Sequence, residues 1–496
     1  MRFRLLSVWC GALCLFVACV PACSGGGPAA TGPSTARSAQ SATSATSGQS
    51  ATSVLPSRVA ADWPTYMGDA ARTGIGPASP AASAPRRTWT ATVDGDVYGQ
   101  PLVVGSNVIA ATEQNSVYAL AAATGAVRWR AQLGTPVPLS QLQCGNIDPN
   151  GITSTPVVDT ASGTIYAVAM LAGPPRHELF ALRLGDGSVV WHRAVDVAGA
   201  DPGHHQQRGA LNLAGGHIYF SYGGFEGDCD PYHGRVVAAP TDGTGPLETW
   251  QVPSEAEGAI WAPPGPVISS TGDVWVSTGN TANGPEGSGN AGPYDGANSV
   301  MRLDAALAGA VDQWAPRNWA SLNRRDIDLA SMAPALLPGG LVFAAGKEGT
   351  GYLLRADHLG GIGGEVFSKT VCPGGGPEGG AFGGAVVAGA TLFVPCRDGV
   401  TAVRVDVAKA SFSVSWQVAK QANTPLLAYG WVWTVVADTL GLHAAWSGSL
   451  VGLDPATGVE RARLKLGGIP HFPSMGTAGG TLYVGGLGSV YAVSVA

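Results

Sequence analysis

One short stretch of the sequence gathers residue types that could do chemistry. "GGFEGDCDPYHG", residues 223–234, places three acids, a cysteine, a histidine and a tyrosine directly after an apolar run, in a chain of which only 12% of residues are charged. A carboxylate such as that of Glu226 suits a hard cation, so the stretch is a candidate metal or cofactor loop. The same residue types also suit a solvated loop beside a structural disulfide, and the stretch alone leaves both interpretations open.

Other motifs exclude several familiar enzyme classes. "GSGNAG" at 287–292 fits Gly-x-Gly-x-x-Gly but lies in a Gly/Asn/Pro-rich loop with no helix after it, so it is not a dinucleotide turn. His204 and His205 lack a partner at zinc-type spacing and are interpreted as surface residues. No Gly-x-Ser-x-Gly is present, so a hydrolase of that type is not supported.

The first residues predict export. "MRFRLLSVWCGALCLFVACVPAC" carries Arg2 and Arg4 before an apolar run, which is typical of a signal peptide over residues 1–23. "VPAC" resembles a bacterial lipobox, so we expect Cys23 to carry a lipid that anchors the protein on the outer face of the cytoplasmic membrane or in the cell envelope; Pro21 is unusual there and leaves a plain secreted form open. Residues 24–61, rich in Ser, Thr, Ala and Gly, predict a disordered tether.

Four cysteines remain once the signal peptide and the anchor are set aside: Cys144, Cys229, Cys372 and Cys396. In an exported protein an even number predicts two disulfides, and the sequence permits three connectivities. None of these cysteines lies in the C-x-x-C-H motif of a c-type haem. The formal charge is −6 and no run of Lys or Arg is present, so nucleic acid is not an expected partner.

An internal repeat organises residues 62–496. "VYALAAATGAVRWR" (117–130), "LFALRLGDGSVVWHR" (179–193) and "LVGLDPATGVERAR" (450–463) each join two alternating strands through a Thr-Gly or Asp-Gly turn, and looser copies lie between them. Two more apolar runs precede each copy, so a unit holds about four short strands. Four-stranded units that recur at about 50 residues predict an all-β chain folded as a β-propeller.

The two ends of this repeat region predict how the ring closes. The last copy, "VYAVSVA" (490–496), ends where its fourth strand should begin, and an unpaired strand, "RRTWTATV" (86–93), precedes the first full unit. Pairing the two would complete an eighth blade and leave no open sheet edge. The sequence therefore predicts an eight-bladed β-propeller closed by an N-terminal strand, which we expect to be a monomer.

The repeat also carries a family resemblance. Its Thr-Gly-x-x-x-Trp plan, together with "DWPTYMGDAARTG" at 62–74, resembles the pyrroloquinoline quinone (PQQ) repeat of eight-bladed quinoprotein alcohol dehydrogenases and of related non-enzymatic bacterial lipoproteins. The resemblance covers essentially all of residues 62–496. It implies the fold; because one fold hosts many functions, it implies activity only where the site residues match too.

Five features match the family's cofactor site, in the family's order. By this resemblance Glu226 in "GGFEG" and Asn280 in "VSTGN" would bind Ca²⁺, and Trp261 in "GAIWAPP" would form the floor under PQQ. Asp326 or Asp328 in "RRDIDLASMAP" would be the catalytic base, and Lys347 in "GKEGTGYLL" would contact the quinone oxygens. Taken singly, each residue is as well explained as a loop, turn or packing residue, so the functional interpretation depends on their joint order.

Departures from the family concern the cover of the site. Those dehydrogenases hold two adjacent cysteines above the quinone, whereas "LQCGNIDPNG" has only Cys144, and the Arg that follows in the family is absent. A bond from Cys144 to Cys229 could replace this cover, and neighbouring blades would bring Cys372 to Cys396. The loop after Glu226 and the insertion at 283–297 could also reshape the pocket.

Two classes of function remain open. The first is a PQQ- and Ca²⁺-dependent dehydrogenase-like protein that oxidises an alcohol and, lacking a haem motif, passes electrons to a separate acceptor. The second is a non-catalytic lipoprotein whose propeller binds a protein or polysaccharide partner at the cell envelope. The retained site residues favour the first class, and the missing cysteine pair favours the second, so enzymatic activity is left undecided.

Overall fold

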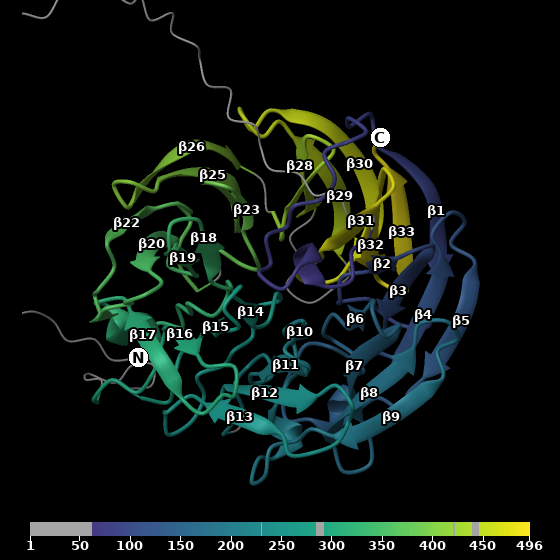
Figure 1. Cartoon of the computed structure of the whole chain (residues 1–496), viewed down its shortest axis with the longest axis horizontal. Helices are drawn as coiled ribbons and strands as arrows, with labels where there is room; N and C mark the ends of the chain where they lie inside the picture. The colour runs from purple at the N-terminus through teal and green to yellow at the C-terminus, as the bar shows by residue number, and fades with distance from the viewer. Residues whose placement is uncertain (1–61, 230, 284–291, 378, 420–421, 439–445) are drawn as a thin grey trace, which may run out of the picture. The chain divides into compact units, whose positions relative to one another are not determined.

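The computed structural model describes residues 62–496 except 230, 284–291, 378, 420–421 and 439–445. The predicted signal peptide, the lipid anchor at Cys23 and the tether of 24–61 lie outside the described residues. Within the described part, the strands form eight sheets, and these are arranged as blades around a central axis (Figure 1). The prediction of an eight-bladed, all-β propeller is confirmed.

Each of the first four blades holds four antiparallel strands in sequence order, counted outward from the axis. Blade 1 consists of β2 (Leu102–Val104), β3 (Asn107–Ala111), β4 (Ser116–Ala121) and β5 (Val127–Gln132). Blade 2 consists of β6 (Val157–Asp159), β7 (Thr164–Leu171), β8 (Arg176–Arg183) and β9 (Val189–Ala194). Blade 3 consists of β10 (Asn212–Ala214), β11 (His217–Tyr222), β12 (Arg235–Pro240) and β13 (Glu248–Gln251). Blade 4 consists of β14 (Val267–Ile268), β15 (Val274–Ser277), β16 (Val300–Leu303) and β17 (Ala310–Ala315), with β21 (Gly361–Ile362) added in parallel at its edge.

The last four blades follow the same plan, except that the final one takes its outer strand from the start of the domain. Blade 5 consists of β18 (Ala335–Leu337), β19 (Leu341–Ala345), β20 (Thr350–Arg355) and β22 (Phe367–Thr370). Blade 6 consists of β23 (Val386–Ala388), β24 (Thr391–Cys396), β25 (Gly399–Asp406) and β26 (Ser411–Ala419). Blade 7 consists of β27 (Leu426–Ala428), β28 (Trp431–Ala437), β29 (Trp446–Leu453) and β30 (Glu460–Ile469). Blade 8 consists of β31 (Met475–Ala478), β32 (Thr481–Gly486), β33 (Ser489–Ser494) and β1 (Arg86–Thr92).

Helices are short connections in this fold. The described residues contain one α-helix, α1 (Trp319–Asn323), and three single 3-10 turns, η1 (Tyr66–Gly68), η2 (Leu139–Gln141) and η3 (Pro202–His204). No helix in the part of the chain that the structure covers combines the length and the apolar character needed to span a membrane.

The repeated turn of the sequence is explained by contacts between blades. Trp129 on the outer strand of blade 1 donates its indole N–H to the backbone oxygen of Leu184 in blade 2, at 3.1 Å. A Cβ added at Gly187 would lie 2.4 Å from this ring, and Gly187 has a φ of +73°, so only glycine suits the position. Trp89 and Gly125 repeat the arrangement between blades 8 and 1. The Thr-Gly-x-x-x-Trp plan therefore encodes the packing of one blade on the next.

The ring closes through β1. This strand pairs antiparallel with β33, from Arg86 opposite Ser494 to Thr92 opposite Ser489. The predicted pairing of residues 86–93 with the last repeat is confirmed, and the N- and C-terminal parts of the propeller share one sheet.

Residues 62–76 close one end of the central channel. Their backbone hydrogen-bonds to the first strands of five blades: Trp63 to Val103, Pro64 to Val158, Ala70 to Ile268, Thr73 to Val387 and Gly74 to Leu427. Tyr66 and Met67 are buried. In Figure 1 the purple N-terminal segment lies near the centre of the ring. We call residues 62–76 the plug.

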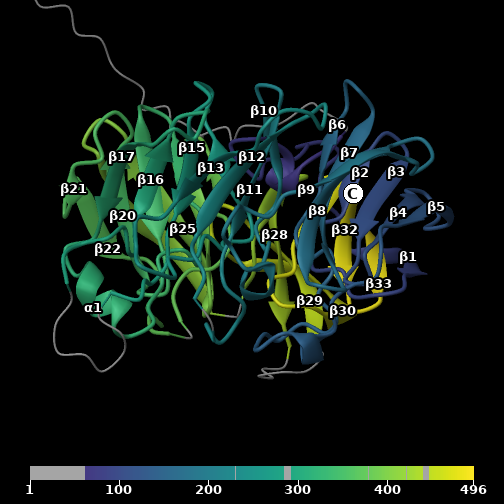
Figure 2. The ribbon, with the colours of Figure 1, turned by 90° about the horizontal axis from the view of Figure 1, so that it is seen from below.

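The opposite end of the channel is built from loops. Because neighbouring strands of a blade are antiparallel, the loop that enters a first strand and the loop that leaves a second strand lie at the same end of the ring. We call this the site end, since all the predicted site residues lie in such loops. Figure 2 shows the ring from its side, with α1 at its lower edge; α1 lies in the connection that enters β18.

Candidate functional site

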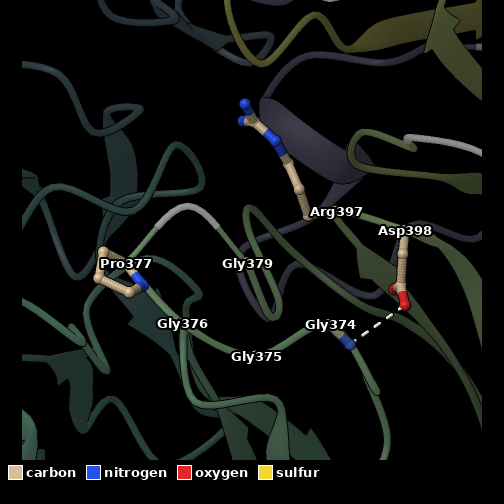
Figure 3. A pocket seen from close by; sticks show the side chains of 7 residues that line it. All are labelled: Gly374, Gly375, Gly376, Pro377, Gly379, Arg397 and Asp398. Atoms are coloured by element: carbon tan, nitrogen blue, oxygen red, sulfur yellow. Dashed lines mark hydrogen bonds between the residues drawn. The ribbon is translucent and has the colours of Figure 1, made fainter.

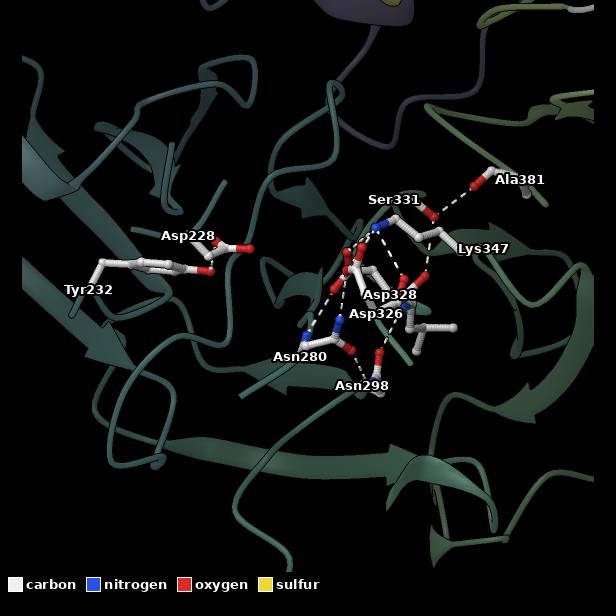
Figure 4. A network of polar contacts seen from close by, with 10 residues as sticks. Asp228, Tyr232, Asn280, Asn298, Asp326, Asp328, Ser331, Lys347 and Ala381 are labelled. Carbon is white, nitrogen blue, oxygen red and sulfur yellow. Dashed lines mark hydrogen bonds and ion pairs between the residues drawn. The ribbon is translucent and has the colours of Figure 1, made fainter. Parts of the chain in front are cut away.

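Lys347 is the centre of a polar network at the site end. It follows β19, and its ammonium lies 2.8 Å from a carboxylate oxygen of Asp328 and 3.0 Å from one of Asp326 (Figure 4). Both aspartates lie in the loop that enters β18, and the backbone N–H of Lys347 donates to the backbone oxygen of Asp328 at 2.8 Å. The side chains of Lys347 and Asp328 are each 11% exposed, whereas that of Asp326 is 59% exposed.

Asn280 completes the network from the loop after β15. Its side-chain amide donates to Asp326 at 3.0 Å, and its backbone N–H donates to Asp328 at 2.9 Å. Its side-chain oxygen accepts a hydrogen bond from the amide of Asn298 at 2.9 Å. A Cβ at Gly279 would lie 2.6 Å from the Asp328 carboxylate, which explains the glycine of the Thr-Gly-Asn motif. The structure thus joins four of the predicted residues: Asn280, Asp326, Asp328 and Lys347.

The charges of this network shift the pKa values of the titratable groups in and around it. Burial of the ammonium acts to lower the pKa of Lys347, but the carboxylates of Asp328 and Asp326 outweigh it, so the pKa lies above its usual value. Two further carboxyls feel the same charges. The pKa of Asp228 is raised to about 6 and that of Glu257 to about 7, in both cases mainly through desolvation and then through repulsion by nearby carboxylates.

Trp261 joins the network from the loop that enters β14. The ring is half-buried, and the Lys347 ammonium lies 5.9 Å from its centroid, in cation–π range. Phe382 and Phe472 each lie 6.1 Å from the Trp261 ring, and these two rings stack on each other at 5.6 Å. We call Trp261, Phe382 and Phe472 the aromatic cluster.

Glu226 lies outside this network. It is exposed in the turn after β11, and its carboxylate makes no hydrogen bond or ion pair with another described residue. Two residues further on, Asp228 accepts a hydrogen bond from the Tyr232 hydroxyl at 2.7 Å, and Figure 4 shows its carboxylate on the side of the network. The bond of Cys229 to Cys144 holds the loop in this position. The predicted approach of Glu226 to Asn280 therefore stays a prediction, and Asp228 is the acid of this loop whose pKa is affected by Asp326 and Asp328.

Both predicted disulfides are present. Cys144 bonds to Cys229 with a Cα–Cα distance of 6.0 Å, and Cys372 bonds to Cys396 at 5.4 Å. The first ties the loop between blades 1 and 2 to the loop after β11. The second ties the Gly-rich loop after β22 to the end of β24.

A hollow of about 460 Å³ opens beside this Gly-rich loop (Figure 3). It is lined by Gly374, Gly375, Gly376, Pro377, Gly379, Arg397 and Asp398. The backbone N–H of Gly376 donates to the backbone oxygen of Lys347 at 2.8 Å, and the Arg397 guanidinium lies 5.8 Å from the Phe382 ring. The hollow therefore adjoins the network and the aromatic cluster.

Sequence reasoning missed Asp228, Asn298, Phe382 and Phe472. A positional signal for the two phenylalanines was available, because each precedes the first strand of its blade, as Trp261 precedes β14. Asp228 could have been found by its place beside Cys229, since a disulfide fixes the direction of neighbouring side chains. Asn298 lies beyond the insertion at 283–297, and no motif in the sequence marks it as a site residue.

Comparisons with known proteins agree with this fold. Residues 81–283 match the protein family described as outer membrane protein assembly factor BamB, PQQ_2. No curated protein sequence matches significantly.

Solved structures extend the likeness to most of the chain. Quinohemoprotein alcohol dehydrogenase from Comamonas testosteroni is 17% identical, with a TM-score of 0.66 over 88% of this chain and 80% of that one. A europium-containing methanol dehydrogenase is 13% identical, with a TM-score of 0.66 over 88% of this chain and 98% of that one. BamB from Moraxella catarrhalis is 13% identical, with a TM-score of 0.52 over 83% of this chain and 98% of that one. At these identities the likeness concerns the fold, and together with the match of residues 81–283 it supports a PQQ-repeat β-propeller.

Proposed function

We propose that the propeller binds a planar quinone of the PQQ type at the site end and acts as a dehydrogenase-like protein outside the cytoplasmic membrane. The observation that supports this is the meeting of Trp261, Lys347 and two aspartates from three separate loops. Trp261 offers an aromatic face for stacking. Lys347 holds a positive charge beside that face, where charge would develop on the oxygens of a reduced quinone.

The different exposure of the two aspartates separates their roles. Asp326, at 59% exposure, can reach a substrate hydroxyl, so we assign it as the general base that accepts the hydroxyl proton. Asp328, at 11% exposure, binds the Lys347 ammonium and the Asn280 backbone, which makes it a positioning residue. The quinone, when bound, would accept the hydride from the alcohol carbon. A separate acceptor would then take the electrons.

Calcium does not fit the donors of this site. The Lys347 ammonium already lies between the carboxylates of Asp326 and Asp328, and the side-chain oxygen of Asn280 accepts from Asn298. Among the described residues, no group of three or more His, Cys, Asp or Glu side chains is placed to hold a metal ion. In the proposed reaction the Lys347 ammonium therefore supplies the positive charge.

A second candidate is a non-catalytic propeller that binds a protein or polysaccharide of the envelope. It is favoured by the state of the site, because Asn280, Asp328 and Lys347 satisfy one another and the aromatic cluster packs on itself. The match of residues 81–283 to an assembly-factor family points the same way. Anchoring through a lipid at Cys23 belongs to both proposals; loss of labelled fatty acid in Cys23→Ser would test it.

Addition of PQQ to the purified protein separates the two candidates. The first predicts a raised melting temperature and retained quinone absorbance after gel filtration, since a ligand of the native state stabilises it. Both signals should be lost in Trp261→Ala and kept in Lys409→Met, which removes an exposed lysine elsewhere. Ca²⁺ should add nothing. Absence of quinone binding by the wild type would establish the second candidate instead.

A further inference from the structure

A second polar cluster lies at the site end and takes no part in the Lys347 network. Arg208 precedes β10 and is only 8% exposed. Its guanidinium lies between two rings, 5.9 Å from the centroid of Tyr98 and 5.8 Å from that of Phe472. Its hydrogen bond to the His471 backbone oxygen is long, at 3.4 Å, and no described carboxylate lies within ion-pairing distance.

Glu113 supplies the opposite charge from another blade. It follows β3 and is 2% exposed. One carboxylate oxygen accepts hydrogen bonds from the Gly151 N–H at 2.7 Å and from the Thr153 hydroxyl at 3.2 Å. The other oxygen is buried and has no hydrogen-bond partner in the described part of the chain. The backbone N–H of Glu113 donates to the backbone oxygen of Asp96 at 3.0 Å, and Asp96 lies two residues before Tyr98, whose ring is 5.9 Å from the Arg208 guanidinium. The two charged groups therefore lie near each other, and Arg208 acts to lower the pKa of Glu113.

The burial of these two charged groups costs free energy in the absence of a ligand. A buried ion is normally paired or fully hydrogen-bonded, and an unsatisfied buried carboxylate oxygen costs free energy that a partner, or protonation, recovers. Among the described residues, the Arg208 guanidinium has no carboxylate partner, and one Glu113 carboxylate oxygen has no hydrogen-bond partner. The two groups lie near each other but do not pair. A small molecule between them that carries both opposite charges would satisfy both groups.

We propose that Arg208 and Glu113 form a binding site for a small zwitterion of the α-amino acid type, with the ligand carboxylate on Arg208 and the ligand ammonium on the idle oxygen of Glu113. A guanidinium binds a carboxylate through two parallel hydrogen bonds, and an ammonium is a strong donor to a carboxylate. Charge balance selects the zwitterion, because a simple anion would leave Glu113 unpaired. The Tyr98 and Phe472 rings, which enclose the guanidinium, limit the ligand to a small size.

This proposal can be tested separately from quinone binding, although Phe472 belongs to the surroundings of both sites. Phe472 contacts Trp261 on one side and Arg208 on the other. A ligand on Arg208 would therefore lie next to the aromatic cluster. Its binding is measured without any quinone, so failure of one proposal leaves the other intact.

The test is calorimetric titration of the purified protein with glycine, L-alanine, acetate and methylamine. We expect glycine and alanine to bind and the two single-charge probes to bind at least tenfold more weakly, since each loses one charged hydrogen-bonded contact. Arg208→Gln and Glu113→Gln should each weaken glycine binding about tenfold or more. Arg130→Gln, which removes an exposed arginine paired with Asp94, should leave it unchanged.

Proton release on glycine binding can be measured with the wild type, so this test does not depend on the folding of a variant. Burial raises the pKa of Glu113 to about 7, against the lowering effects of Gly151, Thr153 and Arg208 and the raising effect of Asp96. An ammonium on Glu113 requires the carboxylate, so glycine binding by the wild type at pH 7 should release a fraction of a proton, seen as a dependence on buffer ionisation enthalpy. Failure of glycine and alanine to bind, or acetate binding as tight as glycine binding, would overturn the proposal. Glycine binding without proton release, or binding that survives both variants, would do the same.

Discussion

Two buried arginines show how differently the two ends of the channel are built. Arg72 in the plug is 3% exposed and donates to the Thr65 hydroxyl at 2.6 Å and to the backbone oxygens of Tyr66 and Leu211, each at 2.9 Å. Arg208 at the site end is buried almost as deeply, but its hydrogen bond to a described residue is 3.4 Å long. The Arg72 guanidinium thus makes three short hydrogen bonds, although its buried Nε has no partner among the described residues, whereas Arg208 makes one long hydrogen bond.

The same contrast extends to the surroundings of both residues. The plug meets five first strands through regular backbone hydrogen bonds, which is how buried backbone groups are normally satisfied. The site end instead collects carboxyls whose pKa values are raised, at Glu113, Asp228 and Glu257. Perturbed titratable groups gathered at one end are typical of functional surfaces. Arg72 in the plug is perturbed too, since burial lowers its pKa to about 9, so the contrast concerns carboxyl groups with raised pKa values.

Removal of the closing segment should have the largest effect. Deletion of residues 24–93 takes away the plug and β1, so the first strands of five blades lose partners and β33 becomes an open edge. We expect cooperative thermal unfolding to disappear. Deletion of 24–61 alone is the control and should leave the melting temperature unchanged. A truncated domain that melts as sharply as the intact one would refute this role of the N-terminal segment.

Removal of the Lys347 charge should be the most damaging single substitution at the site end. Lys347→Met leaves two carboxylates without their cation, and breaking a buried ion pair in this way costs about 3 to 5 kcal/mol. Lys409→Met removes a comparable pair with Asp406 at the same 2.8 Å distance, but there the lysine side chain is 80% exposed, so the cost should stay below about 1 kcal/mol. Urea unfolding at pH 7 measures both. Equal losses would mean that the Lys347 network contributes no more than a surface pair.

The two arginines give the next effect in size. Arg72→Met leaves a buried hydroxyl and two carbonyl oxygens without their donor, which should cost about 3 kcal/mol. Arg208→Met removes an unpaired buried charge, so the free energy of unfolding should stay within about 1 kcal/mol of the wild type. Urea midpoints of both variants at pH 7, in the absence of ligand, make the comparison. A loss at Arg208 as large as that at Arg72 would show that Arg208 is structural.

The fold was predictable because a short sequence pattern that forms one blade recurs along the chain. A turn glycine lies against the tryptophan of the preceding blade at four blade contacts, for example Gly187 against Trp129 and Gly243 against Trp191, so the same short pattern recurs along the sequence. Closure by residues 86–93 followed from counting strands. The plug could not be predicted in detail, since its bonds to five blades depend on the finished ring and not on neighbours in sequence.

The site was predictable only in part, for a related reason. Motifs that continue a strand, such as Asn280 after β15 and Lys347 after β19, were placed well because the strand fixes their position. Glu226 lies four residues beyond the end of β11, in a loop held by the Cys144–Cys229 bond, and at that distance the strand no longer determines the direction of the side chain. The position of Arg208 near Glu113, on another blade, has no signature in a single sequence.

The pH dependence of stability should show the contribution of the site end. Glu257 and Asp228 have folded-state pKa values of about 7 and about 6, above those of an unfolded chain. Between pH 4 and pH 7 these two groups bind more protons in the native state, so their contribution to stability falls as pH rises through this window. His205, whose pKa is lowered to about 4 by burial, acts in the opposite direction. Glu257→Gln should flatten the fall, seen in urea midpoints from pH 4.5 to 8. Asp186→Asn, at an exposed turn where hydrogen bonds to Ser188 lower the pKa, should not.

The smallest change in stability is expected at Asp326, and it should come with the largest change in function. Asp326 is 59% exposed and shares Lys347 with Asp328, so Asp326→Asn should cost less than about 1 kcal/mol, whereas Asp328→Asn, in a buried pair that also holds the Asn280 backbone, should cost about 2 to 3 kcal/mol. If Asp326 is the base, PQQ-dependent oxidation of a short alcohol, followed by an artificial electron acceptor, should fall about 100-fold or more in Asp326→Asn while PQQ still binds. Glu226→Gln, in the exposed turn outside the network, is the matched control and should retain full activity. A fall in activity with Glu226→Gln in place of Asp326→Asn would return the catalytic role to the loop of residues 223–234.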